Sequence, residues 1–164
     1  DKNLVSVLDG GLKKWLIENR KTTGEKTILN NSTYRATENK NLVKSILEVN
    51  ENIGQKNFTI IDARSKERFN GSVPDPRKNV KSGSIPNSVC LPFKEIINSS
   101  DNTFKGVSEI SKKFSEIIDL NDDKTVFSCG SGITACVLGL AYSLVNNTYS
   151  PTVYDGSWAE YGRI

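Results

Sequence analysis

A cysteine stands in a loop of small residues between two apolar segments. Cys129 begins the sequence Cys-Gly-Ser-Gly-Ile-Thr. Gly130 and Gly132 can adopt backbone angles that are closed to other residues, which lets successive N–H groups point at one spot. A helix that begins there adds partial positive charge, and thiols at such positions have pKa values well below the usual value of about 8.5. We therefore expect Cys129 to be a reactive thiolate. The anion-binding loop that would hold its charge consists of Gly130, Ser131, Gly132, Ile133 and Thr134.

The segments on either side of this loop predict how it is held. Residues 125–128 are mostly β-branched or aromatic, as in a buried strand, and residues 134–145 are apolar on nearly every face, as in a helix buried against a sheet. Open α/β sheets bind ligands just beyond the carboxyl ends of their strands, where Cys129 falls. The alternative is that Cys129 is a small buried residue with a packing role, as we expect for Cys90 and Cys136.

The composition of the chain excludes several uses of a reactive cysteine. There is no histidine, so the chain alone lacks the imidazole base of a cysteine protease and the ligands of a mixed Cys/His zinc site. The three cysteines are widely spaced and form no C-x-x-C pair, which argues against a redox dithiol or an all-cysteine metal site. A cysteine phosphatase has an arginine six residues after its cysteine, but here that residue is Ala135. A sulfur-bound intermediate suits the remaining donors, and we expect neither a cofactor nor a metal.

Two arginines are candidates for binding an anionic substrate. Arg68 and Arg77 lie in a long stretch with glycine and proline that continues to Pro86, and connections of this length are often functional. Forked guanidinium groups suit a carboxylate. The alternative is that both arginines are solvated on a surface loop. For Asp62 and Arg64, at the end of an apolar segment, we expect a structural ion pair that orders the following loop.

Length and composition limit the class of protein. A chain of 164 residues with 36% apolar and 25% charged residues is long enough for one packed domain. The net charge is +3 and the lysines are spread along the chain, so we expect no nucleic-acid partner. No apolar run approaches the length of a membrane span, and we expect no membrane partner. The odd number of cysteines, without regular spacing, is typical of a reducing compartment.

The order of the predicted elements gives the fold class. Strands alternate with helices, which predicts an α/β fold with an open, mainly parallel sheet and helices on both of its faces. Four strands are expected near Phe58, Val89, Thr125 and Thr152, and a fifth that is either hidden in the pattern or contributed by residues near Val5 or Tyr34. Helices are expected over residues 38–49, 94–97, 108–118 and 134–145 and after residue 155, with Thr37 as the N-cap of the first.

A short internal repeat predicts the domain organisation. Residues 7–12 followed by Trp15 align with residues 153–158 followed by Tyr161. We expect residues 1–19 to be the last strand and helix of a truncated first domain, residues 20–40 to be a linker along the surface of the next domain, and residues 41–164 to be the catalytic domain. The alternative is that residues 5–8 add an edge strand to a single sheet. Since the chain begins with Asp1, we expect that the native start and any targeting peptide are missing.

Two stretches of the sequence resemble one family. The loop Cys-Gly-Ser-Gly-Ile-Thr-Ala-Cys resembles the active-site loop of 3-mercaptopyruvate sulfurtransferases, within the rhodanese superfamily, and residues 62–77 resemble its pattern DAR-x-x-x-RF-x-G-x-x-P-x-PR. Rhodaneses that prefer thiosulfate typically have basic residues after the cysteine, whereas Gly130, Ser131 and Gly132 are neutral. The chain departs from the family at Ser84, where histidine is usual, and at Asn87, where glycine is usual.

The resemblance implies a rhodanese-like fold for both domains and a function for each site residue. Cys129 would carry a persulfide, Ser131 would belong to a proton relay, and Arg68 and Arg77 would bind the substrate's carboxylate. The implied enzyme moves sulfur from 3-mercaptopyruvate to cyanide or to a thiol such as that of thioredoxin. It would work with a missing N-terminal rhodanese domain that supplies part of the relay.

Two other functions and two locations stay open. The alternatives to a 3-mercaptopyruvate sulfurtransferase are a thiosulfate–cyanide sulfurtransferase that uses the same cysteine and a non-catalytic rhodanese interaction module. We expect a cytoplasmic location, with the mitochondrion as the alternative.

Overall fold

The computed structural model describes residues 4–121, 124–146 and 150–164. Within these residues, four strands form one parallel sheet in the order β2-β1-β3-β4. The strands are β1 (Thr59–Asp62), β2 (Val89–Cys90), β3 (Thr125–Ser128) and β4 (Thr152–Val153). Asp62 is the register partner of Ser128, so the carboxyl ends of the two central strands lie together. The residues that follow β1 and β3 are thereby brought to the same edge of the sheet.

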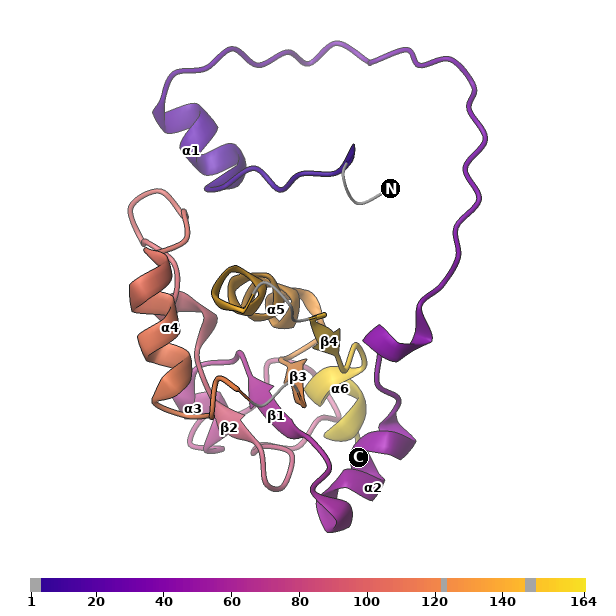
Figure 1. The fold of residues 1–164 in the computed structure, drawn as a ribbon, viewed down its shortest axis with the longest axis vertical. Coiled ribbons are helices and arrows are strands. Elements are labelled where there is room, and N and C mark those ends of the chain that lie inside the picture. The colour runs from indigo at the N-terminus through magenta and orange to yellow at the C-terminus, as the bar shows by residue number, and fades with distance from the viewer. Residues whose placement is uncertain (1–3, 122–123, 147–149) are drawn as a thin grey trace.

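Helices cover both faces of this sheet (Figure 1). On one face, α4 (Val107–Ser115) and α5 (Ile133–Val145) pack on Ile61 and Phe127 of the central strands. The ring of Tyr142, on α5, has its centroid 5.9 Å from that of Phe127. This apolar layer holds α5, and with it the loop after Cys129, against the sheet.

The opposite face is covered by α2 (Ile46–Gln55) and α6 (Ser157–Tyr161). Ile60 and Val126 pack on this side with Trp158 of α6, whereas the next residue of each strand packs on the other face. Side chains of a strand alternate between its two faces, which explains why the two middle residues of both strands are apolar. The predicted α/β class, parallel sheet and two-sided helical cover are confirmed.

The predicted start of the first helix of this domain is wrong. A 3-10 helix, η2 (Lys40–Leu42), comes first, and α2 begins after Ser45 rather than after Thr37. Ser45 and Glu48 form a capping box: the Ser45 Oγ accepts from the Glu48 N–H (3.3 Å), and the Glu48 carboxylate accepts from the Ser45 N–H (2.9 Å). Two otherwise unsatisfied donors are paired in this way, which fixes where the helix begins.

Two short helical elements complete the domain. They are α3 (Lys66–Phe69) after β1 and η3 (Phe93–Glu95) after β2. In the part of the chain that the structure describes, no helix is long and apolar enough to cross a bilayer.

The predicted fifth strand is also wrong. Residues 5–8 have no regular structure, and the side chains of Val5 and Tyr34 are 72% and 79% exposed, so neither is buried against the sheet. The edge contact comes from Val43 instead, which forms an isolated parallel bridge to Val153 of β4.

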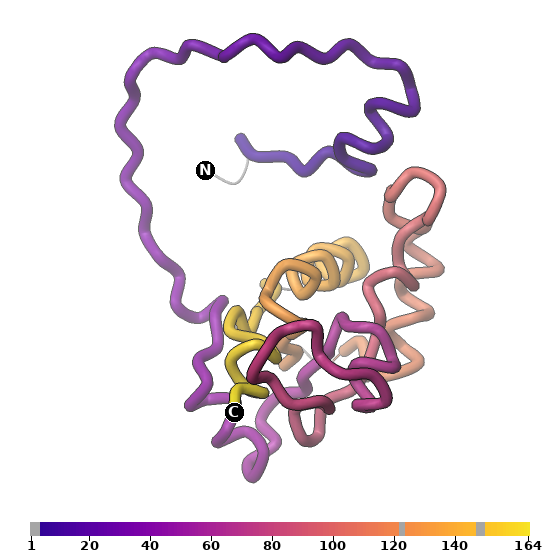
Figure 2. Tube along the Cα trace, turned by 180° about the vertical axis from the view of Figure 1, so that it is seen from behind, coloured from indigo at the N-terminus to yellow at the C-terminus, as the bar shows by residue number. Residues whose placement is uncertain are grey.

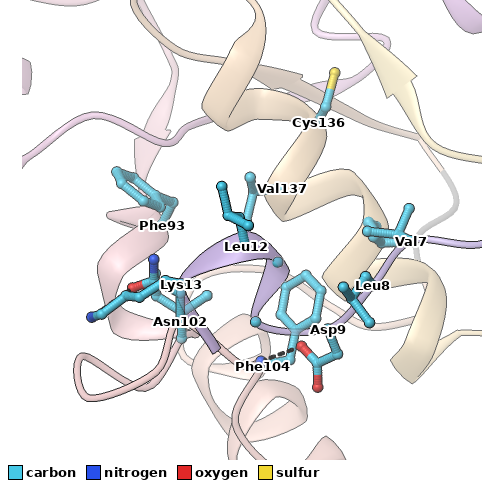
Figure 3. A pocket seen from close by; sticks show the side chains of 14 residues that line it. Val7, Leu8, Asp9, Leu12, Lys13, Phe93, Asn102, Phe104, Cys136 and Val137 are labelled. Carbon is cyan, nitrogen blue, oxygen red and sulfur yellow. Dashed lines mark hydrogen bonds between the residues drawn. The ribbon is translucent and has the colours of Figure 1, made fainter. Parts of the chain in front are cut away.

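The N-terminal segment forms helix α1 (Gly11–Ile17) and contacts the domain near η3 and α5. The Asp9 carboxylate accepts a hydrogen bond of 2.9 Å from the Phe104 N–H, drawn as a dashed line in Figure 3. A pocket of about 500 Å³ lies between this segment and α5. Residues 20–39 are exposed and contain no helix or strand. They arc away from the sheet in Figures 1 and 2, so the expectation that they follow the domain surface is wrong.

The two copies of the predicted repeat share an unusual backbone feature. Gly11 and Ser157 occupy matching positions, and each begins a helix with a left-handed φ, of 54° and 50°. Glycine adopts this conformation freely, whereas serine does so at a cost. Ser157 therefore needs compensating interactions, which are found beneath the Cys129 loop.

Candidate active site

Cys129 lies directly after β3, at the start of the loop that leads to α5. Its surface is only 2% exposed, but it lines a pocket of about 390 Å³ together with Arg68, Arg77, Ser131 and Thr134. The N–H of Ser131 donates a hydrogen bond of 3.4 Å to the Cys129 Sγ. The thiol is therefore at the base of a pocket and within reach of a loop amide.

The surroundings of Cys129 favour its thiolate form. Burial raises the pKa of the thiol, but hydrogen bonds from the Thr134 side chain and from the N–H groups of Ser131, Ala135 and Thr134 lower it by more. The pKa of Cys129 consequently lies below its ordinary value. Donors that point at a sulfur stabilise its charged form, so more of this cysteine is ionised near neutral pH than of an exposed one.

The two glycines of the loop have different roles. Gly132 has a left-handed φ of 84°, and a Cβ there would collide with the Asp155 carboxylate. Gly130 is not left-handed, contrary to our expectation. Its value is space, because a Cβ at Gly130 would lie 3.2 Å from both terminal nitrogens of Arg77 and 3.3 Å from Nη2 of Arg68. The absence of a side chain at Gly130 thus lets two guanidinium groups approach the residue after the thiol.

A buried serine supports the loop from the side opposite the pocket. The Ser157 Oγ accepts hydrogen bonds of 3.1 Å from the N–H groups of Cys129 and Gly132 and donates one of 2.9 Å to the carbonyl oxygen of Tyr154. These two loop amides point at α6, so the expectation that successive N–H groups all converge on the sulfur is wrong. The three bonds compensate for the left-handed backbone of Ser157, which sequence reasoning missed as a site residue. The repeat was the signal that could have found it.

The two predicted arginines converge over the loop, and a third residue holds them. Asp75 accepts from Arg68 Nη2 at 2.7 Å through Oδ2 and from Arg77 Nη1 at 3.2 Å through Oδ1. The Asp75 side chain is 1% exposed, against 26% for Arg68 and 35% for Arg77. Sequence reasoning missed Asp75, although it stands between the two arginines in Pro-Asp-Pro-Arg. The alternative of two separately solvated arginines is excluded.

The predicted ion pair between Asp62 and Arg64 is confirmed and is structural. Arg64 Nη2 lies 2.7 Å from Asp62 Oδ2 and donates to the carbonyl oxygen of Gly83 at 2.8 Å. Its guanidinium also lies 4.7 Å from the ring centroid of Trp158. Both charged side chains are almost fully buried, at 1% and 2% exposure, so this pair orders the loop that carries Arg68.

The remaining predicted residues lie at the rim of the pocket. Ser131 and Ile133 are exposed and line it, and among the described residues the Ser131 hydroxyl makes no hydrogen bond. Lys94, which sequence reasoning also missed, is an exposed cation of the same pocket.

The other two cysteines differ from the expectation of buried packing residues. Cys136 is exposed, so the expectation is wrong there; it lines the pocket between α5 and the N-terminal segment, and in Figure 3 its sulfur points away from the other labelled side chains. Cys90 is half-buried, and burial raises its pKa to about 11.

Comparison with known proteins assigns the family. The model of the rhodanese-like domain matches residues 45–163, which contain the sheet, the Cys129 loop and both arginines. The chain belongs to the rhodanese family. Its resemblance to that family is thereby confirmed, and so is the rhodanese fold.

Several sulfurtransferases are similar to this rhodanese chain. The mouse (Mus musculus) 3-mercaptopyruvate sulfurtransferase is 36% identical over 158 residues, which are 96% of this chain and 52% of that protein. Thiosulfate/3-mercaptopyruvate sulfurtransferase 1, mitochondrial, of Arabidopsis thaliana is 39% identical over 79% of this chain and 34% of that protein. The crystal structure of SseA from Escherichia coli, described with the rhodanese fold of 3-mercaptopyruvate sulfotransferases, has a TM-score of 0.76 and 29% identity over 94% of this chain and 56% of SseA. The chain thus spans about a third of the length of the Arabidopsis relative and about half of that of the mouse relative.

Proposed function

We propose that this rhodanese domain transfers sulfur from a small anionic donor to a thiol or to cyanide through a persulfide on Cys129. One observation carries the proposal: a thiol whose pKa lies below its ordinary value shares a pocket with two guanidinium groups that converge over the next residue. The first feature suits a nucleophile and the second suits an anionic substrate.

The reaction has two steps. The Cys129 thiolate attacks the sulfur of 3-mercaptopyruvate, an S–S bond forms, and the C–S bond breaks with its electron pair leaving on carbon. The resulting enolate takes a proton and departs as pyruvate. The acceptor thiolate or cyanide then attacks the outer sulfur, which regenerates the Cys129 thiolate. The loop donors that stabilise the thiolate would stabilise the charged persulfide as well, because they are already oriented.

The other site residues bind the donor and move its proton. Arg68 and Arg77 would hold the carboxylate so that the donor's sulfur meets Cys129. Ser131, exposed in the same pocket, would relay the proton of the substrate thiol. The loop residues from Gly130 to Thr134 would surround the transferred sulfur.

The preferred donor is 3-mercaptopyruvate rather than thiosulfate. The residues directly after Cys129 are neutral. The positive charge that faces the donor is supplied instead by Arg68, Arg77 and Lys94. The mouse relative has a name that specifies the keto acid, whereas the Arabidopsis relative has a name that includes both donors. Thiosulfate therefore remains the second candidate.

The domain organisation that fits this function is a tandem one. The repeat and the shared left-handed φ of Gly11 and Ser157 support the division into residues 1–19 from a first rhodanese domain, a linker over 20–40 and a catalytic domain over 41–164. The first domain would complete the proton relay. We expect the acceptor to be a small thiol or a thioredoxin-like protein, and the location to be the cytoplasm or the mitochondrion.

The test is the fate of the donor's sulfur. The chain is incubated with 3-mercaptopyruvate without an acceptor, pyruvate is measured, and each cysteine is examined by mass spectrometry of alkylated peptides. We expect one added sulfur atom on Cys129 and pyruvate in equal amount, both lost in Cys129→Ser and both kept in Cys136→Ser. Sulfur on another residue, or pyruvate release that survives Cys129→Ser, would contradict the proposal. No reaction with either donor, with and without an added first domain, would favour the non-catalytic module.

A further inference from the structure

One buried carboxylate sets the charge of the subsite formed by the two arginines. The Asp75 side chain is 1% exposed and accepts from Arg68, from Arg77 and from the backbone N–H of Arg77, the last at 3.0 Å. It does not line the pocket, whereas both arginines do. Asp75 thus lies behind the guanidinium groups and is aimed at them rather than at the substrate.

The arginines retain donors that Asp75 does not use. Each gives Asp75 one terminal nitrogen of its guanidinium. Within the described residues, the Nε of Arg68 is buried without a hydrogen-bond partner, and buried donors are nearly always paired. The terminal nitrogens of Arg77 and Nη2 of Arg68 also lie against Gly130. Terminal nitrogens of both arginines therefore face the pocket beside the residue that follows Cys129, where an anionic ligand can accept from them.

The charge of this group is +1. Two guanidinium groups carry two positive charges and Asp75 removes one. Burial raises the pKa of Asp75, but the bonds from Arg68 and Arg77 lower it by more, so its charged form is favoured. Lys94 adds a charge at the rim, but its exposed ammonium group is screened by water and salt.

We propose that Asp75 is a positioning residue that also determines specificity: it fixes both guanidinium groups over Gly130 and matches the subsite to a donor with a single negative charge, such as the carboxylate of 3-mercaptopyruvate. A dianion such as thiosulfate would suit a subsite of charge +2. Charges in a partly buried pocket act on each other with little screening, so one unit of charge is enough to alter the preference. This inference rests on the proposed function.

The experiment compares two donors in charge variants of Asp75. Asp75→Asn raises the charge of the subsite to +2, and we expect the ratio of kcat/KM for thiosulfate to that for 3-mercaptopyruvate to rise about 10-fold, which corresponds to about 1.4 kcal/mol. The change should be in KM rather than in kcat, because Asp75 does not touch the reacting sulfur. Asp75→Glu keeps the charge and should keep the donor ratio of the unmodified chain. Glu116→Gln, which removes one negative charge from an exposed position directly after α4, is the matched control and should leave the ratio unchanged.

A second variant separates charge from folding. Asp75→Asn with Arg77→Gln returns the subsite to +1, and we expect the preference for the keto acid to return although both donors bind more weakly. If Asp75→Asn alone does not fold, Arg77→Gln alone decides the matter, because it lowers the charge of the subsite to zero and should lower the ratio of kcat/KM for thiosulfate to that for 3-mercaptopyruvate. The proposal is overturned if the single variant changes both donors by the same factor, or if the double variant keeps the thiosulfate preference.

A binding measurement distinguishes failure of this inference from failure of the proposed function. Pyruvate and sulfate, a monoanion and a dianion, are titrated as protectants of Cys129 against iodoacetamide. We expect pyruvate to protect the unmodified chain at the lower concentration and Asp75→Asn to move the ratio of the two protecting concentrations about 10-fold toward sulfate. This readout needs no turnover. If neither donor is turned over but this shift is seen, the proposed function fails and the inference about Asp75 stands; if turnover is normal and no shift is seen, the inference alone fails.

Discussion

Two groups of polar residues surround Cys129, and they differ in burial and in net charge. The floor of the site consists of Asp62, Arg64 and Ser157, which are at most 3% exposed and are hydrogen-bonded to other protein groups. The mouth of the site consists of Arg68, Asp75, Arg77 and Thr134. Its arginines are 26% and 35% exposed, and the Nε of Arg68 has no partner among the described residues.

The difference shows that the same residue types can serve structure or binding. In the floor, one arginine is matched to one aspartate, so the net charge of the pair is zero. In the mouth, two arginines share one aspartate, which leaves a net positive charge and unused donors beside the pocket. Substitutions in the floor should therefore change the free energy of unfolding, and substitutions in the mouth should change substrate binding or the pKa of Cys129.

The largest effect is expected for Arg64→Ala in the floor. It leaves the Asp62 charge buried without its partner, and breaking such a pair costs about 3–5 kcal/mol. Denaturant unfolding followed by circular dichroism measures the loss. Arg68→Ala is the comparison in the mouth and should cost clearly less, because Asp75 keeps Arg77. Equal losses for the two variants would remove the distinction between floor and mouth.

Substitution of the mouth arginines by lysine should alter binding. Arg68→Lys and Arg77→Lys keep the charge but lose the forked geometry, so we expect the KM for 3-mercaptopyruvate to rise about 10- to 100-fold with kcat changed much less. Steady-state pyruvate release measures both constants. Arg163→Lys, at an exposed arginine, should leave both unchanged. An unchanged KM in both site variants would show that the carboxylate binds elsewhere.

Loss of the serine in the floor should weaken the fold by a smaller amount. Ser157→Ala leaves the N–H groups of Cys129 and Gly132 without an acceptor, at a cost of about 1–3 kcal/mol in the free energy of unfolding. Ser157→Gly loses the same bonds but suits the left-handed backbone, so it should cost less than the alanine variant. If Ser157→Gly is less stable than Ser157→Ala, the left-handed backbone at residue 157 has no cost for the bonds of Ser157 to compensate.

The smallest effect on stability is expected for Thr134 in the mouth. Thr134→Val removes a side-chain hydrogen bond that lowers the pKa of Cys129, so the pH midpoint of Cys129 alkylation should move up. Ser131→Ala keeps the amide that reaches the sulfur and should leave this midpoint in place while it slows turnover. If the pH midpoint of Cys129 alkylation moved in Ser131→Ala but not in Thr134→Val, the roles proposed for these two hydroxyl groups would be contradicted.

Much of the fold follows from local sequence patterns. The strand over residues 125–128 and the helix after it were predicted to within one residue, because a continuous apolar run flanked by glycine and polar residues has few other solutions. The helix start at Ser45 was missed because Thr37 is an equally good cap by residue type, and only the partner Glu48 decides between them. The extra strand near Val5 was predicted from residue type, but Val5 and Val7 lie beside α5 and not beside the sheet.

The site was predictable where the sequence carries the chemistry and not where the fold brings residues together. The position of Cys129 between glycines and the spacing of Arg68 and Arg77 are local features. The N–H groups of Cys129 and Gly132 point at Ser157, and this contact depends on the packing of α6 against the loop. Asn87, where the resemblance led us to expect glycine, has a left-handed φ of 62°, a conformation that asparagine adopts more readily than most residues with a side chain.

The most direct test of the account is the pH dependence of alkylation, resolved for Cys129 and Cys136 in one molecule. The pKa of Cys129 is lowered by the loop donors, whereas that of Cys136 is raised by partial desolvation of its sulfur and by the negative charges of Cys129 and Asp155. Because the thiolate is the reactive form, Cys129 should reach half of its maximal rate at a lower pH than Cys136, and sulfur transfer should fall as the pH drops through the Cys129 midpoint. A Cys129 midpoint at or above that of Cys136 would contradict the claim that the loop holds an ionised sulfur.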